Sequence, residues 1–95
     1  MSKTPSEYEM RFFSMVSRFP RIAHCWDQEE CVLIQERFEH ELQVMSSVEK
    51  AIARFLVGAW FKENRYDFDL FDDLFRMDSS AKRLVIEWIE EQRYS

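Results

Sequence analysis

The chain has 95 residues, of which 46% are hydrophobic and 16% aromatic, and its formal net charge is −5. That length suits one domain, and one Gly with two Pro leaves few sites for tight turns, which argues against a loop-rich or all-β fold. The acidic balance argues against direct nucleic-acid binding, because affinity for phosphates comes from Lys and Arg.

The positions of the charged residues predict neither a membrane-spanning segment nor a signal peptide. No stretch free of Asp, Glu, Lys and Arg exceeds seven residues, whereas a bilayer span needs roughly 20. The first ten residues carry charges and a helix start where a signal peptide has a long apolar region. We therefore expect a cytoplasmic protein without membrane contact, in which Cys25 and Cys31 are reduced thiols.

Apolar residues recur at helical spacing in five segments, which predicts an all-α fold. The short connections between these segments favour a compact antiparallel bundle of about five helices within a single helical domain, residues 1–95. The expected helices cover approximately residues 5–18, 28–45, 47–63, 68–76 and 79–92.

The first two helices are expected to begin at capping boxes. Thr4 with Glu7 forms one such box, and Pro20 ends the helix that follows. After a short connector, Asp27 with Glu30 repeats the capping pattern. A single stripe then predicts the second helix: Cys31, Ile34, Phe38, Leu42 and Met45.

The third helix is the one around which the others are expected to assemble. Ser46 with Glu49 forms its capping box, and Asn64 is a suitable left-handed terminator. Its buried stripe is predicted to contain Val48, Ile52, Phe55, Leu56 and Ala59.

Two shorter patterns follow. Asp67 is expected to cap a helix in which Phe71, Leu74 and Phe75 share one side. Asp78 is expected to cap the last helix, whose stripe is Ala81, Leu84, Val85, Trp88 and Ile89.

Residues that could support catalysis or bind a metal are few. The soft ligands His24, Cys25, Cys31 and His40 lack the paired spacing of zinc sites. Glu36 and His40 are four residues apart, which a solvated helix face explains. With Gly58 as the only glycine, a glycine-rich phosphate loop is excluded. We expect no enzyme activity, no metal and no cofactor.

The third helix has a second apolar side, and this side is the predicted partner-binding surface. It comprises Val57, Phe61, Lys50, Arg54 and Tyr66, an apolar spot with a basic border of the kind that anchors protein interfaces. In the alternative, the short helix near 68–75 folds back over Phe61, and the stems of Lys50 and Arg54 extend past it.

These features favour a small acidic protein that acts by protein–protein interaction, as an adaptor or an inhibitor, and that binds another protein or itself as a homo-oligomer. The alternative is an acidic nucleic-acid mimic that inhibits a nucleic-acid-binding enzyme, as anti-restriction and anti-CRISPR proteins do. Its contacts would be Glu29, Glu36, Glu39, Asp67, Asp69, Asp72 and Asp73. Binding by a mimic would weaken steeply with salt, whereas an apolar interface would be nearly indifferent.

Overall fold

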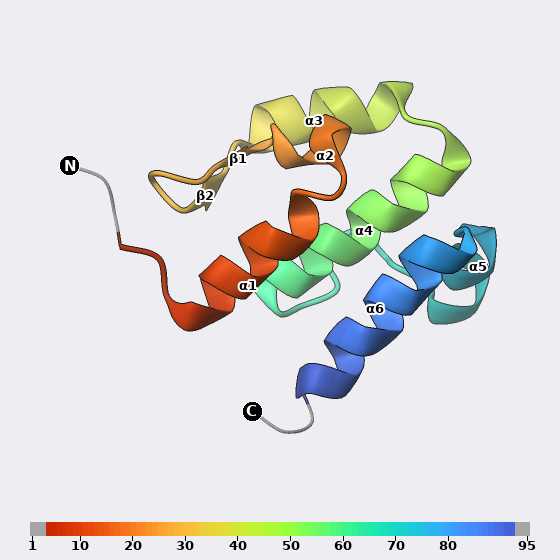
Figure 1. The fold of residues 1–95 in the computed structure, drawn as a ribbon. Coiled ribbons are helices and arrows are strands. Elements are labelled where there is room, and N and C mark those ends of the chain that lie inside the picture. Colours follow the sequence, from red (N-terminus) through yellow and green to blue (C-terminus); the bar gives the residue numbers. More distant parts are fainter. Residues whose placement is uncertain (1–3, 93–95) are drawn as a thin grey trace. The chain divides into compact units, whose positions relative to one another are not determined.

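The computed structural model describes residues 4–92, and helices make up 67% of them (Figure 1). This confirms the expected mostly-α fold class. The helices are α1 (Glu7–Val16), α2 (Pro20–Ala23), α3 (Gln35–Val44), α4 (Ser47–Phe61), α5 (Leu70–Arg76) and α6 (Ser79–Gln92). A short antiparallel hairpin, β1 (Trp26–Asp27) with β2 (Val32–Leu33), lies between α2 and α3.

Contacts divide the chain into two compact units, residues 1–45 and residues 46–95. The N-terminal unit holds α1, α2, the hairpin and α3, and the C-terminal unit holds α4, α5 and α6. The single domain over residues 1–95 stays a prediction.

Helix α1 begins two residues later than its predicted capping box implied. The Ser6 hydroxyl accepts from the Glu9 amide at 3.1 Å, and the Ser6 amide donates to Glu9 Oε1 at 2.8 Å. Ser6 with Glu9 therefore forms the box in place of Thr4 with Glu7. Both pairs have the required spacing, so the pattern alone does not choose between them.

Large aromatic rings fill the interior of the N-terminal unit. Phe12 of α1 packs on Trp26 of β1 with ring centroids 5.1 Å apart, and Trp26 packs on Phe38 of α3 at 6.2 Å. All three side chains are buried, together with Ile22 and Cys25. The hairpin is thus part of this core, because it carries the central ring.

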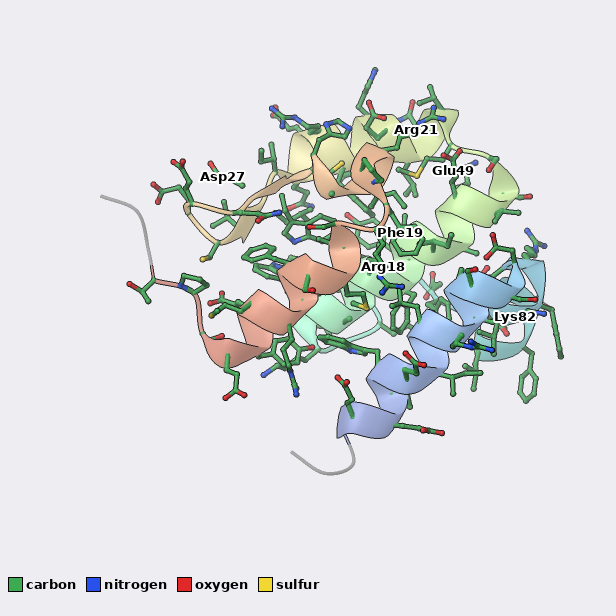
Figure 2. All side chains as sticks on the ribbon, in the orientation of Figure 1. Arg18, Phe19, Arg21, Asp27, Glu49 and Lys82 are labelled. Carbon is green, nitrogen blue, oxygen red and sulfur yellow. The ribbon has the colours of Figure 1, made fainter. Side chains whose placement is uncertain are left out.

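The predicted helix 28–45 is wrong over its first seven residues, where the hairpin lies. Asp27, at the hairpin in Figure 2, accepts from the amides of Glu29 and Glu30, both at 3.1 Å. The same side-chain-to-backbone bond that caps a helix here closes a turn. Cys31 then takes a positive φ of 56°, which no helix continues through, and α3 starts at Gln35.

Helix α4 starts where predicted and ends slightly earlier. Ser46 and Glu49 form the expected capping box, with bonds of 3.2 and 3.0 Å. The left-handed terminator is Lys62, with φ of 59°, and Asn64 has a different role. Its side chain donates to the Phe68 carbonyl and accepts from the Phe68 amide, which holds the loop between α4 and α5.

The predicted cap of α5 is wrong, and the predicted cap of α6 is confirmed. Asp69, and not Asp67, caps α5, because its Oδ1 accepts from the amides of Phe71 and Asp72 at 2.9 Å. Asp78 caps α6 as predicted, accepting from the Ala81 amide at 2.8 Å.

The core of the C-terminal unit follows the predicted stripes of α4 and α6 in part. The buried residues that belong to the predicted stripes are Ile52, Phe55 and Leu56 of α4 and Ala81, Val85 and Trp88 of α6. Ala59 and Leu84 of these stripes are only partly buried, and α4 also buries Ala51, Ala53 and Val57. Val48 and Ile89, predicted to be inward, are exposed near the ends of their helices. The Phe68 ring packs on Phe55 with centroids 5.6 Å apart, so the loop before α5 covers α4.

Phe55→Ala should lower the free energy of unfolding by roughly 3–5 kcal/mol, because it removes a buried ring and leaves a cavity under Phe68. Urea unfolding followed by circular dichroism measures this. The matched control is Phe71→Ala, whose ring is exposed and should change stability by less than about 0.5 kcal/mol. A loss below about 1 kcal/mol for Phe55→Ala would mean that this face of α4 is not core.

Candidate functional site

The five residues predicted to bind a partner, four on α4 and Tyr66 in the loop after it, differ in exposure. Val57 is 0% exposed, so its side chain is unavailable to a partner. Lys50, Arg54, Phe61 and Tyr66 are each partly exposed. The binding role of these four residues stays a prediction, and the structure adds specific contacts for two of them.

Arg54 pairs with a carboxylate that the sequence analysis had placed on an acidic surface. Its Nη1 lies 3.1 Å from Oδ1 of Asp73, a residue of α5 that is only 4% exposed. The other oxygen, Oδ2, accepts from the Asp69 amide at 2.8 Å. Asp73 therefore anchors α5 to α4, and its buried carboxylate cannot serve as a contact of a nucleic-acid mimic.

Phe61, at the end of α4, carries a cation over its ring. The Arg65 guanidinium carbon lies 4.0 Å from the centroid of the Phe61 ring, in cation–π geometry, and Glu63 in turn accepts from Arg65 Nε. The two alternatives for Phe61, an open interface and the fold-back of residues 68–75, both stay predictions. Helix α5 contacts α4 at Arg54, through Asp73.

Among residues 46–92, the most exposed aromatic residues lie on α5. Phe71 and Phe75 are 71% and 72% exposed and are four residues apart, so they project from one side of the helix, with Leu70, 49% exposed, beside them. We call Leu70, Phe71 and Phe75 the α5 aromatic surface. Lys82, labelled on α6 in Figure 2, places its ammonium 5.8 Å from the Phe75 ring centroid.

Sequence reasoning grouped Phe71, Leu74 and Phe75 correctly on one side but implied that this side packs inward. The structure turns the opposite side of α5 inward, where Asp73 and Met77 are buried. The signal that could have revealed this is Arg54, a cation within an apolar helix, because a buried cation needs a carboxylate partner.

An apolar pocket of about 280 Å³ lies beside this site, between α4, the following loop and α6. Its polar side chains are already engaged, Arg54 by Asp73 and Asn64 by the Phe68 backbone. Its volume lies just below the range of roughly 300–1,000 Å³ typical of small-molecule sites. The pocket is large enough for one bulky apolar group. The lining residues are Arg54, Phe55, Gly58, Ala59, Glu63, Asn64, Phe68 and Ile89.

The carboxylates proposed for nucleic-acid mimicry fall into two groups on different units. Glu29, Glu36 and Glu39 are exposed on the hairpin turn and α3, in the N-terminal unit. Asp67, Asp69 and Asp72 are exposed in the C-terminal unit, where Asp69 already accepts two amides of α5. With Asp73 buried, no single acidic surface of the predicted composition is defined.

The soft metal ligands named from the sequence, His24, Cys25, Cys31 and His40, all lie in the N-terminal unit. His24 Nε2 is 3.6 Å from Glu41 Oε2, and Arg37 donates to the His24 carbonyl at 2.7 Å. Cys25 is fully buried, and this burial, followed by the Glu41 charge, raises the pKa of its thiol to about 11. Among residues 4–92, no three His, Cys, Asp or Glu side chains are grouped so as to hold a metal ion.

Comparison with known proteins gave no match to a protein-family model, a curated protein or a solved structure. Within residues 4–92, no helix has the combination of length and apolar character that crossing a membrane requires. The candidate site therefore depends on the geometry of the C-terminal unit alone.

Cys25 should be alkylated by iodoacetamide at pH 8 about 100-fold more slowly than in the urea-unfolded chain, because a thiol with a raised pKa holds little thiolate. Peptide mass spectrometry over time measures the rate, and a Cys31→Ser variant isolates Cys25. The rate should climb about tenfold per pH unit up to roughly pH 11. Labelling of native Cys25 at the unfolded rate would contradict this.

Arg54→Ala should lower the free energy of unfolding by about 3 kcal/mol, because it leaves the Asp73 carboxylate buried without its cation. Lys50→Ala, one turn earlier on α4, is the control and should cost less than about 0.5 kcal/mol. Adding Asp73→Ala to Arg54→Ala should recover part of the loss. Additive losses in the double variant would show that the two groups do not interact.

Proposed function

We propose that this protein acts by protein–protein interaction, as a non-catalytic adaptor or inhibitor, and that the α5 aromatic surface is where it binds. The observation that carries the proposal is the exposure of Phe71 and Phe75 on one side of a single short helix. Aromatic residues are enriched at interface centres, and contiguous exposed apolar surface marks binding sites on soluble proteins.

Burying one Phe ring is worth roughly 1.5–3 kcal/mol, so two exposed rings leave a sizeable stabilisation unused by the fold. A partner that covers both rings would bind with this additional stabilisation. The rings are also presented on a fixed helix, because Asp69 caps α5 and Asp73 holds it to Arg54. A surface ordered before binding loses less entropy when the partner docks.

The polar groups support a role without catalysis. The pair of His24 with Glu41 is partly exposed and belongs to the N-terminal unit, and neither residue lines the pocket. The buried Cys25, with its raised pKa, is a poor nucleophile. A cytoplasmic setting agrees with two free thiols, Cys25 and Cys31.

The double variant Phe71→Ala/Phe75→Ala should lose partner binding and keep its fold. Immobilised protein is incubated with extract of its source cells, and retained proteins are quantified by mass spectrometry. We expect at least about tenfold less of the specific partner, since truncating an anchor costs about 2 kcal/mol of binding. The melting temperature should change by less than about 2 °C.

The matched control is Met10→Ala/Val44→Ala, which removes two side chains of 59% and 58% exposure from the N-terminal unit. Phe61→Ala tests the surface predicted on α4. If Phe61→Ala abolishes capture and the α5 variant does not, the binding surface is on α4 and the proposal fails. Capture that weakens steeply between low and high salt would instead favour an acidic mimic.

A further inference from the structure

Around α5 the exposed side chains form parallel columns. At 100° per residue, Phe71 and Phe75 stand in the central column of the exposed side. Asp72 and Arg76 form the next column on one flank, and Leu70 begins the column on the other flank. One flank of the aromatic surface therefore carries a negative charge toward the N-terminus of α5 and a positive charge toward its C-terminus.

This order of charges is self-complementary under two-fold symmetry. When two identical helices pack antiparallel, the two-fold axis keeps the same flank on the same side and reverses the chain direction. Asp72 of each copy then faces Arg76 of the other, and Phe71 of each copy lies beside Phe75 of the other. Both charge pairs form at once, and all four rings are covered.

The two charges are available for such pairing. Asp72 and Arg76 are both exposed, and the ion pairs found within residues 4–92 involve neither of them. Their spacing along α5 allows only a weak interaction within the helix. The Asp69 and Asp73 carboxylates, by contrast, are held by backbone amides and by Arg54.

We propose that the α5 aromatic surface binds α5 of a second copy of this chain, antiparallel across a two-fold axis. This inference rests on the proposed function of that surface and names its partner. Two rings about 70% exposed supply roughly 300 Å² per copy, below the approximately 800 Å² per partner of a stable interface. The dimer is therefore weak and reversible.

Charge exchange tests the pairing, with sedimentation equilibrium from about 10 to 500 µM, the range in which so small an interface should assemble. The native chain should approach twice the monomer mass at the upper end, and Phe71→Ala/Phe75→Ala should stay monomeric. Asp72→Arg and Arg76→Asp should each weaken self-association at least about tenfold, because each places like charges opposite one another.

An equimolar mixture of the two single variants is the decisive sample. Opposite charges then face each other in both pairs of a mixed dimer, so association should return to near the native level. The double variant Asp72→Arg/Arg76→Asp should also self-associate, and circular dichroism of each variant controls for folding. Neutral Asp72→Asn and Arg76→Gln provide variants that perturb α5 less.

A native chain that stays monomeric at 500 µM, or a mixture that associates no better than its components, would overturn the second copy as partner. The proposed function would still stand if Phe71→Ala/Phe75→Ala lost capture of another protein. A dimer that persists in Phe71→Ala/Phe75→Ala would place self-association elsewhere on the chain and overturn this inference.

Discussion

The buried carboxylate of Asp73 determines how the second half of the C-terminal unit is arranged. A carboxylate that is only 4% exposed is costly unless it is paired, and Asp73 meets this requirement with Arg54 and the Asp69 amide. These bonds fix which side of α5 faces α4. Because Asp73 points inward, Phe71 and Phe75 point outward, and the exposed aromatic rings are a consequence of where the charge is held.

Apolar burial alone would favour the opposite rotation of α5. Turning Phe71 and Phe75 inward would gain several kcal/mol, but the same rotation would separate Asp73 from Arg54 and leave an unpaired charge near the core. Removing one partner of such a pair costs about 3–5 kcal/mol, which is similar in size. The observed orientation therefore leaves two rings exposed without a large penalty to the fold, and this is the condition that a binding surface on α5 needs.

The sequence predicted the helical class and most of the buried stripes, because helical periodicity is a property of one segment at a time. The positions of the helix caps were predicted less accurately. Ser6 and Asp69 each lie two residues after the predicted caps, and Asp27 closes a turn where a helix was expected. A short polar side chain bonds to nearby amides in all these settings, so the local pattern does not distinguish them. The orientation of α5 was missed because it depends on a contact between Arg54 and a residue 19 positions further along the chain, which no local pattern shows.

Helix α5 has seven residues, too few to be stable in isolation, since helices shorter than about 12–15 residues are marginal in water. Its structure must come from the Asp69 cap, the Arg54–Asp73 pair and the buried Met77. The cap uses the backbone amide of Phe71, and none of these contacts involves the ring of Phe71 or Phe75. The elements that order the helix are thus separate from the rings proposed to bind, so the rings can be changed without unfolding the surface that carries them. Loss of the Arg54–Asp73 pair, in contrast, should release α5 and abolish binding and local order together.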